Sequence, residues 1–184
     1  MSELRIVIMA GGRAERMNRV EKALLKLRER PLIDYVVDVA KRLGGELYVA
    51  PSRHTPLTEK WCLEKRIPVI GTEGEGYSKD LVYVASKLDR PILFLPADTP
   101  FITPELLARF LEEAMKVRED LVTLVVDRSD FPEELRRGPI RSPVGVSLLK
   151  GDGWGWRDVV MRDFPELLDI DGWLEFRLGE ALLG

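Results

Sequence analysis

Short apolar runs alternate with amphipathic segments along most of this chain, and this alternation constrains the fold more than any other feature. The apolar runs are 4–9, 46–50, 68–71, 92–96, 121–126, 144–149 and 167–170. Between and after them lie segments with apolar residues at helical spacing, namely 31–43, 56–66, 77–88, 103–116 and 173–183. Thr103 followed by Pro104 is a typical helix start. The pattern predicts an α/β fold in three layers, a mostly parallel sheet covered by helices on both faces.

Length and charge indicate the organisation of the chain and its class of partner. With 184 residues and no Ser/Gly/Pro-rich linker, one domain spanning 1–184 is predicted. Lys and Arg number 28 against 31 Asp and Glu, a formal net charge of −3, which argues against nucleic acid or a membrane surface and favours a small charged ligand. No apolar run approaches the roughly 20 residues that span a bilayer, so we expect a cytoplasmic protein.

Several residue types are scarce, and their scarcity excludes whole classes of site. A single cysteine, Cys62, and a single histidine, His54, leave no disulfide framework and no Cys/His metal cage. Any bound metal must therefore have oxygen ligands. We expect Cys62 to be a buried apolar group and His54 to lie in a surface loop. The chain has no glutamine and one asparagine, Asn18, a composition typical of thermophilic proteins.

The first apolar run ends in two glycines, and a basic loop follows. Gly11 and Gly12 allow the backbone to approach a ligand closely. The cations that follow, Arg13, Arg16 and Lys22, suit a polyphosphate. Neither the dinucleotide fingerprint nor the Walker motif matches, because neither the further glycines nor a closing Gly-Lys-Ser/Thr is present. A tight turn with solvated charges would explain the same residues, but close-set cations repel one another and a triphosphate would relieve that repulsion.

An aspartate follows the apolar run at 92–96, in the sequence Leu-Pro-Ala-Asp-Thr-Pro. Ligands of parallel sheets bind beyond the carboxyl ends of the strands, so Asp98 and the Gly11 loop are expected on one rim. Asp98 could form a turn before Thr-Pro. The alternative is a carboxylate ligand for Mg²⁺, which takes few protein carboxylates together with phosphate oxygens and water.

The segment around the two glycines resembles the first motif of nucleotidyltransferases with the Rossmann-like nucleotide-diphospho-sugar transferase fold. That motif reads Leu/Ile-Ala-Gly-Gly, three variable residues, Arg-Met, and a lysine shortly after. The matching residues are Ile8, Ala10, Gly11, Gly12, Arg16, Met17 and Lys22. The run from Val20 to Val37 is similar to the archaeal GTP:adenosylcobinamide-phosphate guanylyltransferases of cobalamin synthesis.

The resemblance implies an enzyme that transfers GMP from GTP to adenosylcobinamide phosphate and releases pyrophosphate. It implies catalytic roles for Arg16, Lys22 and Asp98, with Mg²⁺ on Asp98. It also implies nucleotide contacts from Ala10, Gly11, Gly12 and Arg13. A molybdopterin guanylyltransferase, a sugar-1-phosphate nucleotidyltransferase and a non-catalytic GTP-binding domain remain open alternatives. The expected partners are small molecules without nucleic acid, and the protein is expected to be a monomer or a homodimer.

Two further segments resemble the same family. The stretch 74–81 matches a Gly-x-Gly-Tyr-x-x-Asp-Leu segment near the nucleotide. Its Gly76 permits close approach to a base, and Asp80 could accept hydrogen bonds from guanine N1–H and N2–H₂, although an ordinary helix N-terminus explains the same residues. Gly145, between Val144 and Val146, matches a glycine that faces the bound nucleoside.

The last third of the chain contains the least familiar segments. Relatives often read Asn-Ile-Asn-Thr before the closing helix, whereas this chain reads Asp-Ile-Asp-Gly at 169–172. Asp171 is therefore a second candidate for the metal, or for a ribose hydroxyl. The polar stretch 127–143 predicts a mobile insertion outside the core. Trp154 and Trp156, in a glycine-rich turn, are candidates for packing or for covering a large ligand.

Overall fold

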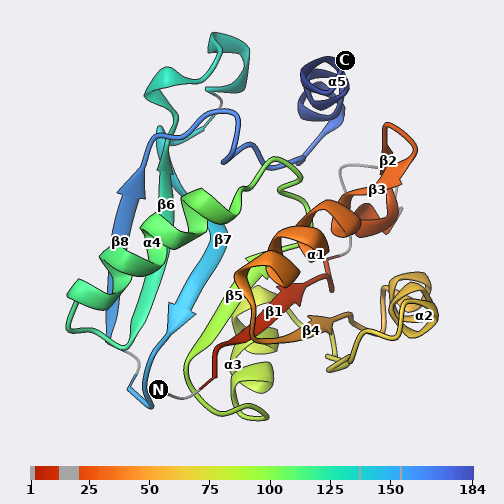
Figure 1. Cartoon of the computed structure of the whole chain (residues 1–184). Helices are drawn as coiled ribbons and strands as arrows, with labels where there is room; N and C mark the ends of the chain where they lie inside the picture. Colours follow the sequence, from red (N-terminus) through yellow and green to blue (C-terminus); the bar gives the residue numbers. More distant parts are fainter. Residues whose placement is uncertain (1–2, 13–20, 137, 154) are drawn as a thin grey trace.

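The sheet at the centre of the molecule is mostly parallel, as the sequence predicts (Figure 1). The computed structural model describes residues 3–12, 21–136, 138–153 and 155–184. Within them the sheet is formed by β1 (Arg5–Met9), β4 (Glu46–Ala50), β5 (Ile92–Pro96), β6 (Leu121–Asp127), β7 (Arg141–Leu149) and β8 (Trp156–Met161). The strand order is β4-β1-β5-β7-β6-β8, and β7 runs antiparallel to both of its neighbours.

Helices cover both faces of this sheet, which confirms the predicted three layers. Helices α1 (Leu32–Leu43) and α4 (Pro104–Lys116) lie on one face, and α3 (Tyr77–Ala85) lies on the other (Figure 1). Strand β1 shows why both faces are apolar, since Ile6 and Ile8 join the cluster with α1 and α4 while Val7 joins the cluster with α3.

The remaining elements lie around the sheet. Helix α2 (Pro56–Glu64) follows the edge strand β4, and a short hairpin joins β2 (Lys26–Leu27) to β3 (Arg30–Pro31). Helix α5 (Trp173–Leu182) contacts that hairpin at the upper end of the molecule (Figure 1). Helix α4 begins as predicted, because the Thr103 side chain accepts a hydrogen bond from the Leu106 N–H at 3.1 Å and Pro104 follows it. No helix in the described part of the chain is both long and apolar enough to cross a membrane.

Two predicted strands were wrong, and three strands in the described residues were missed: β8 of the central sheet, and β2 and β3 of the short hairpin. The run 167–170 is largely buried, but Leu167 ends a turn and the backbone from 168 to 170 is irregular, so the run forms no strand. The run 68–71 forms a single isolated bridge with the described residues, between Val69 and Val49. The missed strand β8 pairs with β6 at the edge of the sheet, and its residues are exposed or half-buried; its three consecutive apolar residues, 159–161, follow Arg157 and Asp158 and are too few to predict a buried strand.

The stretch 127–143 is packed against the core, which corrects the prediction of an insertion outside it. Two short turns, η3 (Arg128–Asp130) and η4 (Glu133–Leu135), bring Phe131 and Leu135 into the main apolar cluster. Asp127 anchors the stretch, since its buried carboxylate accepts from Ser129 and, at 3.1 Å, from Arg141 Nε. These hydrogen bonds, those from Ser129 foremost, lower the pKa of Asp127 to about 2.

Candidate active site

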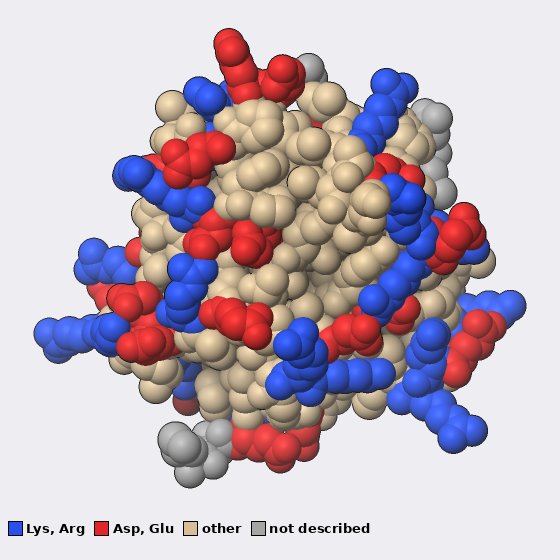
Figure 2. All heavy atoms as spheres, turned by 45° about the horizontal axis from the view of Figure 1, so that its top comes forward, with Lys and Arg blue, Asp and Glu red and all other residues tan. Residues whose placement is uncertain are grey.

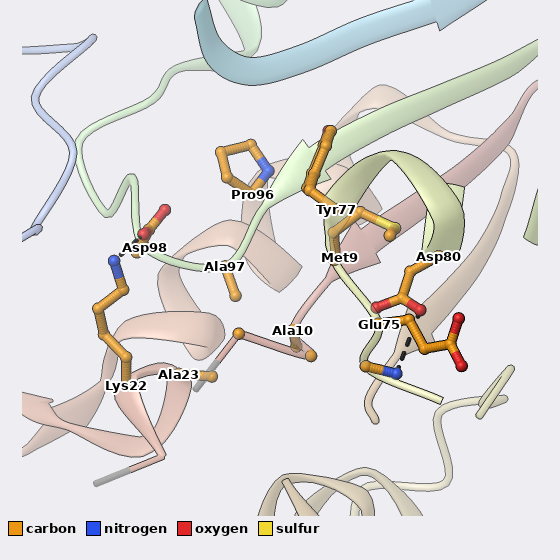
Figure 3. A pocket seen from close by; sticks show the side chains of 14 residues that line it. Met9, Ala10, Lys22, Ala23, Glu75, Tyr77, Asp80, Pro96, Ala97 and Asp98 are labelled. Carbon is orange, nitrogen blue, oxygen red and sulfur yellow. Dashed lines mark hydrogen bonds and ion pairs between the residues drawn. The ribbon is translucent and has the colours of Figure 1, made fainter. Parts of the chain in front are cut away.

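The loops at the carboxyl ends of β1 and β5 and the turn before α3 enclose a cavity of about 590 Å³, the first cavity. Figure 3 shows its side chains and the strands and helix that carry them. Seven residues that the sequence singles out line it: Ala10, Gly11, Gly12, Lys22, Gly76, Asp80 and Asp98. The expectation that Asp98 and the Gly11 loop share one rim is therefore confirmed. Arg13 and Arg16 fall outside the described residues.

Lys22 lies between two carboxylates that are distant in sequence. Its Nζ forms an ion pair with Asp98 and lies 2.9 Å from Asp171 Oδ1. In Figure 3 the Lys22 and Asp98 side chains point toward each other at one end of the cavity. Burial alone would lower the pKa of Lys22, but the attraction of Asp98 and Asp171 outweighs it and raises the pKa. Lys22 therefore carries a full positive charge at neutral pH.

Glu21, the neighbour of Lys22, fixes the same point of the chain to α2. Its Oε1 accepts from the Leu57 N–H at 2.8 Å, and its Oε2 accepts from the Thr58 N–H at 2.6 Å. These first-turn donors have no partner within a helix, so Glu21 acts as the cap of α2. Glu21 and Lys22, which are adjacent and opposite in charge, thus fix the end of the basic loop, Glu21 through α2 and Lys22 through its two carboxylate partners. Sequence reasoning gave Glu21 no such role, although its place beside Lys22 was a usable signal.

Ser52, a residue that sequence reasoning missed, lies between two of the cavity's glycine loops. Its Oγ donates to the Gly11 carbonyl at 2.8 Å and accepts from the His54 N–H at 3.2 Å. A Cβ added to Gly11 would lie 3.0 Å from Ser52 Cβ, and one added to Gly74, at φ +67°, would lie 2.5 Å from the His54 ring. The adjacency of β4 and β1 in a parallel sheet was the signal for Ser52, because their carboxyl ends share a rim.

Asp80 both faces the first cavity and orders the turn before α3. Its carboxyl group is buried, and Oδ1 accepts from the Gly74 N–H at 3.2 Å (Figure 3). Each carboxylate oxygen offers two lone pairs, so this bond leaves acceptor capacity on Asp80. The two readings of Asp80 from the sequence, helix N-terminus and ligand contact, are therefore compatible.

Gly145 lies behind the wall of the first cavity that Tyr77 and Pro96 form. Its carbonyl accepts from the Tyr77 hydroxyl at 2.9 Å. Burial, and after it the charge of Asp98, raises the pKa of that hydroxyl, so Tyr77 stays a donor at neutral pH. Gly145 adopts φ +81° at an irregularity in the β6–β7 pairing, and an added Cβ would lie 3.1 Å from Pro96 Cβ. A glycine is required there by the fold itself.

A second cavity, of about 430 Å³, adjoins the Lys22 ion pair through Asp171. Its lining includes Arg128, whose guanidinium lies 3.2 Å from Asp169 Oδ1. Burial, and then the charge of Asp171, raises the pKa of Asp169 to about 6 despite the opposing effect of Arg128. Figure 2 turns this upper end of the molecule toward the viewer and shows acidic and basic side chains interspersed around a hollow.

Two carboxylates in the described residues suit a hard cation. No group of three or more His, Cys, Asp or Glu side chains in that part of the chain could hold a metal ion. Asp98 and Asp171, however, are close enough to share one ammonium group. Mg²⁺ commonly takes one or two carboxylates and completes its shell with water and phosphate oxygens, so this donor set fits an ion that is bound together with a nucleotide.

Comparison with known proteins places the chain in a family. The model of the MobA-like NTP transferase domain matches residues 6–144. The chain is 40% identical to the adenosylcobinamide-phosphate guanylyltransferase of Methanocaldococcus jannaschii over 96% of each protein. It is 30% identical to the molybdenum cofactor guanylyltransferase of Vibrio cholerae, over 63% of this chain and 56% of that protein.

A solved structure with a similar fold is a nucleotidyl transferase from Methanothermobacter, with a TM-score of 0.73 and 19% identity over 100% of this chain and 99% of that one. At that identity the likeness concerns the fold alone. The sequence matches go further, because one of them spans nearly the whole of both proteins. The chain belongs to the MobA-like NTP transferase family and is a nucleotidyltransferase.

Proposed function

We propose that this nucleotidyltransferase transfers GMP from GTP to adenosylcobinamide phosphate, giving adenosylcobinamide-GDP and pyrophosphate in cobalamin biosynthesis. The observation that carries the choice of acceptor is the match of 40% identity along 96% of the chain to an enzyme of that name. The molybdenum cofactor enzyme of Vibrio cholerae is less similar and matches a shorter part of the chain.

The first cavity is the proposed site for GTP. Ala10, Gly11 and Gly12 would face the phosphates, because the backbone there is open to close approach. Gly76 and the remaining acceptor capacity of Asp80 would serve the guanine, whose N1–H and N2–H₂ are donors that adenine lacks in that arrangement. Gly145 supports the wall on the nucleoside side.

The chemistry requires a phosphate oxygen of the acceptor to attack the α-phosphorus in line while pyrophosphate leaves. A phosphate monoester has a second pKa of about 6, so it is mostly a dianion near neutral pH and needs no general base. The main obstacle is repulsion between two polyanions. We therefore propose that the site accelerates transfer by placing positive charge beside the phosphates.

Among the described residues, one is proposed to supply positive charge directly and two through Mg²⁺. Lys22 is protonated and lies at the edge of the first cavity, where the α-phosphate and the leaving group would meet it. Asp98 and Asp171 would hold Mg²⁺, which when bound neutralises charge on the phosphates. Arg13 and Arg16 are assigned to the phosphates by family resemblance.

The proposal is tested by supplying the purified protein with GTP and Mg²⁺ and, in separate reactions, adenosylcobinamide phosphate, molybdopterin or a hexose 1-phosphate. We expect the highest kcat/KM for adenosylcobinamide phosphate, and a preference for GTP over ATP. A higher kcat/KM for either other acceptor would reassign the substrate within the same family. GTP binding without pyrophosphate release for any acceptor would indicate a binding domain.

Other expectations remain predictions of the sequence. They are a single domain over 1–184, a cytoplasmic location in a thermophile, small-molecule partners without nucleic acid, and a monomeric or homodimeric state.

A further inference from the structure

The second cavity has a position and a lining that the established family assignment does not explain. Resting on the proposed function, we propose that this cavity is the acceptor subsite. In this account Arg128 contacts the phosphate of the acceptor, and Glu175 faces the positively charged corrin ring.

The position of the cavity suits an acceptor. Arg128 directly follows β6, Ser142 lies near the start of the antiparallel β7, and Asp171 precedes α5, so the lining belongs to the same rim as the first cavity. The two cavities meet at one contact, since Asp171 lines the second cavity and pairs with Lys22, which lines the first. An oxygen that enters from the second cavity therefore approaches the charge centre where the α-phosphate is proposed to lie.

The lining combines an apolar floor with an excess of carboxylates. Phe131 and Leu168 are each only 1% exposed and form part of the floor. The charged lining residues are Arg128, Asp169, Asp171 and Glu175. Arg128 pairs with Asp169, and Lys22 pairs with Asp171.

Glu175 is the lining carboxylate for which the described residues provide no ion-pair partner. It lies in the first turn of α5, and its Oε2 would be 3.0 Å from a Cβ built on Gly172, so the side chain folds back over the start of the helix. None of the described residues forms an ion pair with it. The cavity therefore presents a carboxylate, Glu175, that forms no ion pair with any described side chain.

A corrinoid acceptor matches this chemistry. Cobalt(III), a monoanionic corrin ring and a carbon-bound adenosyl ligand together carry one net positive charge, and the ring edge bears neutral carboxamides that donate hydrogen bonds. An unpaired carboxylate attracts such a ligand. Molybdopterin and hexose 1-phosphates contain no comparable cation. The corrin is larger than the cavity, so its edge and the phosphate-bearing side chain would enter while the rest covers the mouth.

The test uses two corrinoids that lack the phosphate and therefore cannot react. Aquocyanocobinamide carries one positive charge, whereas dicyanocobinamide, kept in excess cyanide, is neutral. Binding of each is measured by equilibrium dialysis with the wild type, with Glu175→Gln, and with the control Glu59→Gln, which changes a first-turn glutamate of α2. We expect the cation to bind more tightly to the wild type, and Glu175→Gln to weaken that binding about two- to fivefold while sparing the neutral probe.

The proposed contact between Arg128 and the phosphate of the acceptor is tested by a separate binding measurement. The gain in affinity from cobinamide to cobinamide phosphate, both as the same cyano form, should be smaller in Arg128→Lys than in the wild type, because lysine cannot reproduce the planar fork. A ratio within one variant is insensitive to partial loss of folded protein.

Equal binding of the two charge forms, or equal effects of the Glu175 and Glu59 variants, would overturn the corrin contact. An unchanged phosphate gain in Arg128→Lys would overturn the phosphate contact. These failures differ from failure of the proposed function. Transfer that does not depend on Glu175 or Arg128 would keep the proposed function and reject the acceptor subsite. Corrinoid binding that depends on Glu175, without any transfer, would keep the subsite and reject the proposed function.

Discussion

Lys22 and Asp171 form an ion pair across 149 positions of the sequence, with 2.9 Å between Nζ and Oδ1. The same ammonium also pairs with Asp98. The end of the basic loop, the end of β5 and the segment before α5 are thereby joined at one charge centre. That centre lies on the boundary between the two cavities, which is where transfer from one ligand to another would take place.

Replacing Lys22 should separate its proposed effect on catalysis from its competition with a metal ion for Asp98 and Asp171. Lys22→Met is expected to lower kcat by about 10²- to 10³-fold and to change the KM for GTP much less, because the contact strengthens as charge develops. Without nucleotide, the same variant should bind Mn²⁺ more tightly than the wild type, since no ammonium competes for Asp98 and Asp171. Steady-state kinetics and Mn²⁺ paramagnetic resonance measure the two effects, with Lys26→Met as an exposed control. A change confined to KM would make Lys22 a ground-state contact, and weaker Mn²⁺ binding would refute the competition.

Gly12 offers a test of ligand approach that leaves the fold intact. A Cβ added there meets no atom of the described residues within 4 Å, and the φ of Gly12 is not in the left-handed region. Gly12→Ala should therefore melt at the wild-type temperature without ligand. If the phosphates lie against this backbone, GTP should raise its melting temperature less than that of the wild type, which gains about 2.7 kcal/mol at 100 times Kd. An equal GTP-induced shift in both proteins would place the phosphates elsewhere.

Gly145 and Gly138 form a matched pair for testing whether crowding against Pro96 makes a glycine necessary at position 145. Both adopt a left-handed φ, +81° and +79°, but an added Cβ meets Pro96 only at Gly145. Gly138→Ala should be destabilised by about 1–2 kcal/mol from the backbone alone. Gly145→Ala should lose about 1–3 kcal/mol more through crowding against Pro96. Urea unfolding measures both, and equal losses would show that Pro96 yields without strain.

Asp127 should make the free energy of unfolding depend on pH in the acidic range. Its pKa is lowered to about 2 in the folded protein, chiefly by hydrogen bonds from Ser129. A lowered carboxyl pKa stabilises the fold above the unfolded value of about 3.9, and this contribution is lost as pH falls from there toward 2. Asp127→Asn should therefore melt below the wild type at pH 7, and the gap should close as pH approaches 2. The exposed Asp130→Asn serves as control. A difference in melting temperature between the two proteins that does not change with pH would mean that the charge of Asp127 does not stabilise the fold.

The sequence predicted the sheet and helices well because their apolar periodicity is local. It predicted the shared rim of Gly11 and Asp98 because strand ends in parallel sheets follow a general rule. It missed β8, whose consecutive apolar residues at 159–161 form too short a run, and it placed Phe131 outside the core because polar neighbours mask one buried ring. The contacts of Glu21 with α2 and of Lys22 with Asp171 join distant segments, and only the folded chain reveals them.

The most direct test of the account compares pyrophosphate release by the wild type and by Asp98→Asn, with GTP and adenosylcobinamide phosphate over a Mg²⁺ titration. The amide keeps the shape of the side chain but removes the charge that Mg²⁺ requires. We predict that the wild type releases one pyrophosphate for each adenosylcobinamide-GDP formed, with a rate that rises with Mg²⁺. The folded variant should bind GTP yet lose at least about 10²-fold in kcat. Unchanged turnover and unchanged Mg²⁺ dependence in Asp98→Asn would contradict the assignment of this cavity as the site of transfer.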